Sequence, residues 1–190
     1  GRPPFEALRE IRAMLPAEAE LHVQVAARES EGMIEDARRI ADALGAETYI
    51  KVPAVSEGFR AMKQLSQEGF RVTATAVYTP MQAFLAAKCG ARYAAPYVNR
   101  IDNMGFDGVR VAGEIHEIFQ KNGLNAQVLA ASFKNVQQVL ALCKMGIGAC
   151  TVSPELIETF AASPAIDAAV EGFLKDFEGL VGPGRSMKDC

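Results

Sequence analysis

The sequence predicts an α/β protein built on a parallel β-sheet, and two patterns carry this prediction. Short apolar runs alternate with amphipathic helical patterns about every 25 residues. Glycines fall where the helical patterns end, as C-terminal caps of helices do, at positions 45, 69, 90, 123 and 146. Such βα repetition requires right-handed crossovers, so the sheet is either a doubly wound open sheet or a (β/α)8 barrel. No GxGxxG or Walker-type loop follows a strand, so a nucleotide-binding open sheet has no support.

The elements follow from these patterns in chain order. A helix opens the chain, with prolines at its entry and apolar residues at Phe5, Leu8, Ile11 and Leu15. The predicted strands are 20–27, 48–54, 71–78, 93–99, 126–132 and 149–153. The helices that follow them are 31–44, 56–68, 80–89, 108–121, 135–144 and 154–162, with a last one near 164–178. Only six βα units are visible, whereas a barrel needs eight.

Composition excludes several classes of protein. The chain has 190 residues, 49% of them hydrophobic, so we expect one domain over 1–190 with one sizeable core. The net charge is −3, and the lysines and arginines are scattered along the sequence rather than clustered. The sequence therefore shows no basic patch for nucleic acid or an anionic membrane surface. No run approaches the roughly 20 apolar residues of a membrane helix. Two histidines and four separately placed cysteines argue against a metal site, and without a signal-peptide pattern we expect a reducing cytoplasm.

Lys51 is the residue that points most directly to chemistry. It lies inside the apolar run 47–54, and no other lysine of the chain is placed in this way. A strand of a parallel sheet is covered on both faces, so an ammonium there must be paired, deprotonated or directed into a cavity. Desolvation favours the neutral amine, the form that attacks a carbonyl to make a Schiff base. A lysine at a strand end that extends its amine to solvent is an equally good interpretation of this strand alone.

Polar residues of three other strands share the expected face of Lys51. Side chains alternate along a strand, which places His22, Gln24 and Ala26 together and Tyr49 with Lys51. The same alternation groups Thr73, Thr75 and Val77 in the third strand, and Ala95, Tyr97 and Asn99 in the fourth. Gln24, Lys51, Thr75 and Tyr97 are therefore expected to converge. Each has an ordinary explanation as a packed core residue, but four around one lysine indicate a site.

Residues suited to anion binding follow two of the strands. Arg100 comes after the fourth strand, and Ser132 and Lys134 come after the fifth. In a barrel these positions lie at the carboxyl-terminal mouth, where ligands bind. Arginine makes bidentate hydrogen bonds to phosphate, so a small phosphorylated substrate is predicted. Charged residues in solvated loops are the simpler explanation of each position taken singly.

The segments around these residues resemble a known family, the small transaldolases and fructose-6-phosphate aldolases. The resemblance runs from about residue 21 to 178 and rests on LHVQVAA with EGMIEDA, YIKVPAVSEG, VTATAVYTPMQAFLAAKCGARYAAPYVNRID, VLAASFK and SPAIDAAVEGF. It implies a (β/α)8 barrel and a Schiff-base enzyme that needs no cofactor. It also implies that Lys51 is the Schiff-base lysine, that Gln24, Thr75 and Tyr97 hold a catalytic water, and that Arg100, Ser132 and Lys134 bind the substrate phosphate.

Two branches of this family share the fold. Transaldolases typically carry Glu where this chain has Gln24, Phe where it has Tyr97, and SPFVGR where it has APYVNR. The sequence is therefore more similar to the aldolase branch, with the transferase as the alternative. The resemblance further implies a homo-oligomeric ring, a pentamer or decamer, in which a helix near 164–178 packs on a neighbouring subunit. The first two strands of the family, with an early Asp and a TTNPS-type segment, are not found before 20–27, so we expect a longer native protein. A non-catalytic sugar-phosphate-binding protein is the alternative of another class.

Overall fold

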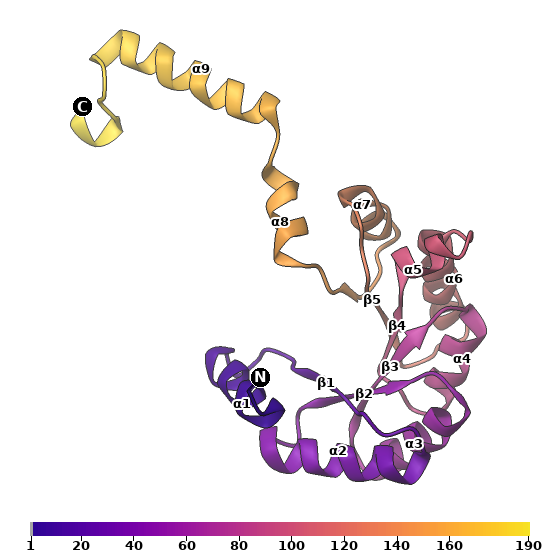
Figure 1. Ribbon diagram of the computed structural model, residues 1–190. Helices are drawn as coiled ribbons and strands as arrows, with labels where there is room; N and C mark the ends of the chain where they lie inside the picture. The colour runs from indigo at the N-terminus through magenta and orange to yellow at the C-terminus, as the bar shows by residue number, and fades with distance from the viewer. Residues whose placement is uncertain (1) are drawn as a thin grey trace. The chain divides into compact units, whose positions relative to one another are not determined.

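Six parallel strands form one sheet in their order along the chain, from β1 to β6. They are β1 (His22–Gln24), β2 (Tyr49–Pro53), β3 (Arg71–Val77), β4 (Tyr93–Pro96), β5 (Gln127–Ala130) and β6 (Ala149–Cys150). In the computed structural model, which describes residues 2–190, this sheet curls into half of a barrel (Figure 1). Sequential parallel strands with helical crossovers are the arrangement of a (β/α)8 barrel. The predicted fold class is confirmed, because the described residues form a partial barrel of this type.

Helices connect successive strands and cover the outer face of the sheet (Figure 1). The unit that ends at Thr151 contains α1 (Pro4–Met14), α2 (Ser30–Leu44), α3 (Ser56–Gln67), α4 (Pro80–Lys88), α5 (Val98–Asn103), α6 (Gly108–Lys121) and α7 (Val136–Met145). A second unit, from Val152 to Cys190, contains α8 (Pro154–Ala161), α9 (Pro164–Val181) and the short 3-10 helix η1 (Met187–Asp189). No helix within residues 2–190 has the length and hydrophobicity needed to cross a membrane.

Capping residues explain where several helices begin and end. Thr79 and Gln82 form a capping box at the start of α4, and Asn135 and Gln138 form another at the start of α7. The predicted helix stops are confirmed, because glycines 45, 69, 90, 123 and 146 all have positive φ at or just after a helix end. Such backbone angles strain residues with a Cβ atom, so glycine is favoured there.

The hydrophobic core lies between the outer face of the sheet and the helices. Ile50 and Val52 of β2 are fully buried in it, next to side chains of α2 and α3 such as Met33 and Met62. Because side chains alternate along a strand, Lys51 between them points to the opposite, inner face. Lys51 therefore lies on the inner face, where the sequence predicts it.

Two predictions about β3 and β4 are wrong in detail. Ala76 has a φ of 52°, and the pairing register of β3 with β4 shifts between Ala74 and Val77. This bulge interrupts the alternation, so Val77 joins the hydrophobic core instead of sharing a face with Thr75. The predicted strand 93–99 ends at Pro96, because the chain turns into α5, and Asn99 belongs to that helix rather than to a strand.

Gly58 allows α3 to pack tightly against the end of β2, the strand that carries Lys51. A Cβ atom at Gly58 would lie 1.8 Å from the Pro53 carbonyl oxygen. We expect Gly58→Ala to lower the free energy of unfolding by about 1–3 kcal/mol, because the helix must move away from the strand. Gly113→Ala in α6 is the matched control, since its Cβ would meet only the flexible end of the Met145 side chain. Urea unfolding of both variants measures the difference, and equal stabilities would contradict this account of Gly58.

Candidate active site

Lys51 lies in the middle of three neighbouring strands on the inner face. It pairs in register with Gln24 of β1 on one side and with Thr73 of β3 on the other. The side chain of Lys51 is partly buried, and that of Gln24 is exposed. Because paired residues of parallel strands project from the same face, the three side chains stand in one row. A lysine placed in this way can reach a ligand within the curl of the sheet.

Thr75 and Tyr97 meet directly on this face. The Thr75 hydroxyl oxygen lies 2.7 Å from the Tyr97 hydroxyl oxygen, and either group can be the donor. Thr75 is 1% exposed, so this contact satisfies a buried hydroxyl. The Tyr97 amide donates to the Val77 carbonyl at 3.1 Å, and the Tyr78 ring packs edge-on at 5.7 Å between centroids. These contacts fix the Tyr97 hydroxyl in position at the carboxyl end of the strands.

The three predicted anion binders lie beyond Tyr97, on α5 and the loop after β5. The Arg100 guanidinium lies over the Tyr97 ring, 4.5 Å from its centroid. The backbone amide of Asn99 donates to the Ser132 carbonyl at 2.7 Å, which brings the helix that carries Arg100 against the loop that carries Ser132. Ser132 is partly buried and has a φ of 64°, an uncommon conformation for a residue with a Cβ atom. Arg100 and Lys134 both have exposed side chains.

A buried amide that the sequence analysis did not single out ties these segments together. Gln138 donates to the Asp102 carboxylate at 2.5 Å, and its own oxygen accepts from the Lys134 amide at 2.7 Å. The other Asp102 oxygen accepts from the Gly108 amide at 2.7 Å. The N-x-x-Q spacing of Asn135 and Gln138 is a capping signal that could have located this residue. Its partner Asp102 is 36 positions away in sequence, which only the fold reveals.

Replacing Gln138 with leucine tests this connection. We expect the free energy of unfolding to fall by about 1–3 kcal/mol, because the Asp102 carboxylate loses a hydrogen bond in a partly buried place. We also expect a higher KM for a phosphorylated substrate with a smaller change in kcat, because the relative position of Arg100 and Ser132 loosens. Gln137→Leu, an exposed neighbour in the same helix turn, is the control. An unchanged KM in Gln138→Leu would show that the Gln138 amide does not contribute to ligand binding.

A second cluster lies closer to the amino ends of the same strands. The His22 ring stacks on Tyr49 at 4.5 Å and meets the edge of Tyr93 at 5.5 Å between centroids. The His22 Nδ1 atom lies 2.9 Å from the Thr73 hydroxyl oxygen. Burial, together with the nearby Glu20 carboxylate, raises the pKa of Tyr93 to about 12 and also raises the pKa of Tyr49. Both phenols therefore stay neutral at physiological pH.

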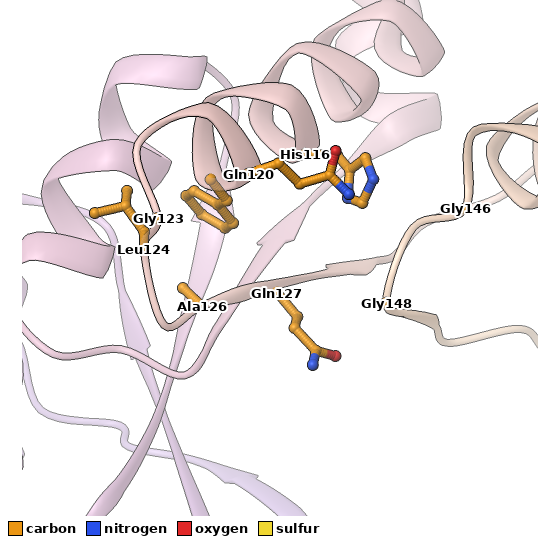
Figure 2. Close-up of a pocket in the computed structure, with 9 residues that line it drawn as sticks. His116, Gln120, Gly123, Leu124, Ala126, Gln127, Gly146 and Gly148 are labelled. Carbon is orange, nitrogen blue, oxygen red and sulfur yellow. The ribbon is translucent and has the colours of Figure 1, made fainter.

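One pocket of the structure lies apart from these residues. Figure 2 shows it between the end of α6 and the beginning of β5, where His116, Gln120 and Gln127 border it together with glycines. In a barrel of this type ligands bind at the carboxyl ends of the strands, whereas this pocket is at the amino ends. We therefore place the candidate active site around Lys51 and Tyr97. Within residues 2–190, no three His, Cys, Asp or Glu side chains are grouped closely enough to hold a metal ion.

Comparison with solved structures supports the fold. Two solved structures share the fold, inosine 5'-monophosphate dehydrogenase from Legionella pneumophila with a TM-score of 0.58 and a mandelate oxidase variant with a TM-score of 0.55. Both are 16% identical to this chain. The matches cover 82% and 76% of the chain and about half of each structure, 49% and 51%. At this identity the likeness concerns the barrel alone.

Sequence comparison is more specific. Residues 5–182 match the family model described as transaldolase/fructose-6-phosphate aldolase. A probable fructose-6-phosphate aldolase from Streptococcus pneumoniae is 38% identical over 173 residues, which are 91% of this chain and 78% of that protein. A probable transaldolase from Anaeromyxobacter dehalogenans is 38% identical over 178 residues, 94% of this chain and 81% of that protein. The resemblance inferred from the sequence is confirmed: this chain belongs to the transaldolase/fructose-6-phosphate aldolase family.

Proposed function

We propose that this chain is a Schiff-base aldolase that cleaves fructose 6-phosphate to dihydroxyacetone and glyceraldehyde 3-phosphate, or forms it from them. Membership of the family supports an enzyme of sugar-phosphate chemistry. The observation that favours the aldolase is the 2.7 Å contact between the hydroxyls of Thr75 and Tyr97 on the face that carries Lys51. A fixed phenol beside a Schiff base can move the protons that cleavage and product release require.

Lys51 carries the covalent chemistry in this proposal. Its neutral amine attacks the ketose carbonyl, and the resulting carbinolamine loses water to give an iminium. The iminium accepts the electrons of the adjacent carbon–carbon bond when that bond breaks, and the aldehyde phosphate leaves. The remaining enamine is protonated, and hydrolysis of the iminium releases dihydroxyacetone and restores Lys51. A water held by Gln24, Thr75 and Tyr97 relays the protons. No step requires a metal or an organic cofactor.

Arg100, Ser132 and Lys134 bind the substrate phosphate in this proposal. Arg100 and Ser132 are supported by the hydrogen bond that joins their segments, whereas Lys134 contributes through charge from an exposed position. An arginine and a hydroxyl close together supply several donors to one phosphate group. Lys51 lies deeper on the same inner face, so a phosphorylated ketose can place its carbonyl near Lys51 and its phosphate at the mouth.

Transaldolase activity is the second candidate. A relative named as a probable transaldolase has the same 38% identity as the one named as a probable aldolase. In the transferase reaction the enamine attacks a second aldose phosphate instead of taking up a proton. Tyr97 and Gln24 favour the aldolase, because their hydroxyl and amide can donate a proton or hydrogen bond near the enamine. A sugar-phosphate-binding protein without catalysis is the third candidate and leaves Lys51 without a role.

Borohydride trapping distinguishes catalysis from binding alone. The chain is incubated with fructose 6-phosphate or dihydroxyacetone, reduced, and mapped by peptide mass spectrometry. We expect a three-carbon adduct on Lys51 and on no other lysine, because reduction fixes the iminium where it forms. Folded protein that acquires no adduct would leave the binding protein as the better candidate.

We infer that the natural partner is a small sugar phosphate in the cytoplasm, and that the chain works as a homo-oligomer. The helix α9 supports the oligomer, because it has exposed apolar side chains, among them Ile166, Val170, Phe173 and Leu174. The molar mass in solution, measured by light scattering, tests this proposal.

A further inference from the structure

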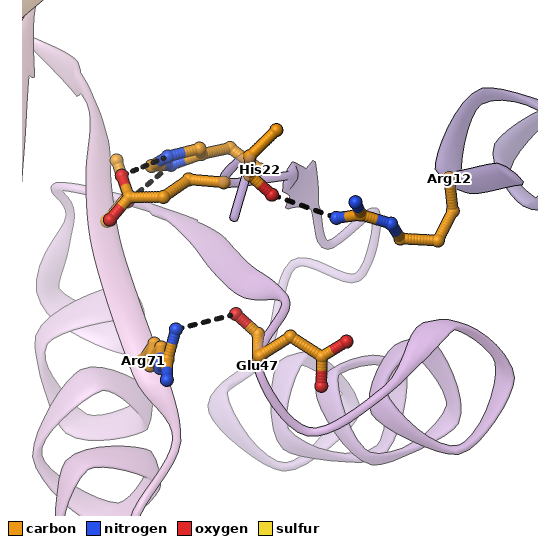
Figure 3. A network of polar contacts seen from close by, with 7 residues as sticks. Arg12, His22, Glu47 and Arg71 are labelled. Carbon is orange, nitrogen blue, oxygen red and sulfur yellow. Dashed lines mark hydrogen bonds and ion pairs between the residues drawn. The ribbon is translucent and has the colours of Figure 1, made fainter. Parts of the chain in front are cut away.

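The His22 cluster contains a continuous chain of polar groups that the proposed reaction does not yet use. The chain begins at the Glu20 carboxylate, 3.5 Å from His22 Nε2, and continues from His22 Nδ1 to the Thr73 hydroxyl at 2.9 Å. Figure 3 labels His22 and marks the polar contacts of its ring with dashed lines. The His22 side chain is 16% exposed, the Glu20 side chain is 42% exposed, and Thr73 is fully buried. A carboxylate, an imidazole and a hydroxyl are thus linked from solvent into the sheet.

The inner end of this series of groups, Thr73, pairs in register with Lys51. Thr73 is the register partner of Lys51 on the neighbouring strand, so both side chains project from the same face. The His22 imidazole lies over Tyr49, on the same strand as Lys51 and two residues before it. Burial lowers the pKa of His22 and the charge of Lys51 lowers it further, whereas Glu20 acts in the opposite direction. A positive charge on Lys51 therefore disfavours protonation of His22.

The other titratable groups around His22 do not compete with it for a proton near neutral pH. Tyr49 and Tyr93 are held neutral, as their raised pKa values require. The arginines near this cluster are Arg71, whose guanidinium lies 5.7 Å from the Tyr49 ring centroid, and Arg92. Of the groups that face this cluster, His22 is the one that is ordinarily neutral at pH 7 and can still take up a proton.

Hydrogen-bond direction in the chain follows from the charges. Glu20 is an acceptor when ionised, so it favours the tautomer that carries hydrogen on His22 Nε2. His22 Nδ1 is then an acceptor, and the Thr73 hydroxyl donates to it. The Thr73 oxygen keeps lone pairs that can accept a hydrogen from the Lys51 ammonium.

We propose that the Glu20–His22–Thr73 chain accepts the proton that Lys51 must lose before it attacks the substrate carbonyl. This inference rests on the proposed Schiff-base function. The ammonium gives one proton to the Thr73 oxygen while Thr73 gives its own to His22 Nδ1, so no net charge is created. Glu20 stabilises the imidazolium, and the proton returns to Lys51 after hydrolysis of the iminium. His22 and Glu20 act through Thr73 and are positioning residues of the site.

The test measures how fast the iminium forms on Lys51 as a function of pH. Dihydroxyacetone is the probe, sodium cyanoborohydride traps the iminium, and mass spectrometry quantifies the adduct between pH 6 and pH 9. The variants are His22→Phe, which keeps a ring on Tyr49, and His22→Asn, which can still hydrogen-bond Thr73 but has no basic nitrogen. Tyr93→Phe is the control, because it keeps the ring against His22 and removes a phenol that contacts Glu20 but does not lie between Glu20, His22 and Thr73.

Both His22 variants are expected to form the adduct on the order of 10²-fold more slowly than wild type at pH 7. The difference should shrink toward pH 9, where hydroxide takes the proton, whereas Tyr93→Phe should follow wild type throughout. If His22→Asn follows wild type, His22 only orients Thr73 and the inference is overturned.

The proposed function and this inference fail in different ways. Wild-type protein without any adduct on Lys51 would remove both, whereas adduct formation with unchanged pH profiles in the His22 variants would remove this inference alone. Glu20→Gln is the second variant if the His22 substitutions prevent folding, since Glu20 is partly exposed and precedes β1. It is expected to slow adduct formation at pH 7 by less than the His22 variants do, and a rate equal to wild type would count against the relay.

Discussion

Replacing Lys51 with methionine is expected to reduce the turnover of fructose 6-phosphate by at least about three orders of magnitude, because the nucleophile of the proposed reaction is lost. Methionine has a similar length and an apolar end, so it fits a partly buried position between Ile50 and Val52. A coupled assay for glyceraldehyde 3-phosphate measures the loss. Lys88→Met, at an exposed position of α4, is the matched control and should retain full activity.

Binding should survive this substitution, because the proposed phosphate ligands Arg100 and Ser132 lie on α5 and the loop after β5, outside β2. Isothermal titration of Lys51→Met with fructose 6-phosphate is expected to give a weakened but measurable affinity. Turnover that persists in Lys51→Met would remove the Schiff-base mechanism, and lost binding together with lost turnover would point to a misfolded sheet.

Tyr97→Phe is expected to change the balance between cleavage and transfer. Without the phenol the enamine is protonated more slowly, so release of dihydroxyacetone should fall on the order of 10²-fold while transfer to a second aldose phosphate falls less. The ring that packs under Arg100 is preserved. The loss of a partner for the buried Thr75 hydroxyl should also lower the free energy of unfolding by about 1–3 kcal/mol.

The ratio of the two rates is measured with fructose 6-phosphate in the presence and absence of an acceptor aldehyde phosphate. Tyr78→Phe is the control, because its ring meets Tyr97 edge-on and its substitution leaves the Thr75 contact in place. An unchanged ratio in Tyr97→Phe would show that this hydroxyl does not protonate the enamine, and the transaldolase would then become the better candidate.

Local patterns in the sequence were sufficient for much of the fold. The helix stops at Gly45 and Gly146 and the alternation of Ile50, Lys51 and Val52 depend only on neighbours along the chain. The structure departs from these patterns at two places in the site. The bulge at Ala76 has a positive φ, which an alanine in the sequence does not predict. The helix α5 is too short for its sequence to show a helical period.

The sequence by itself determined the strand–helix order, the placement of a lysine on an inner strand face, and the long ordered motifs by which the family is recognised. Only the tertiary structure decided which polar groups meet. His22 and Thr73 are 51 positions apart, and Thr75 and Tyr97 are 22 apart, yet each pair lies within hydrogen-bonding distance. The physical reason is that the curl and register of the sheet, together with the bulge in β3, fix these distances, and those properties depend on long-range pairing that no local pattern encodes.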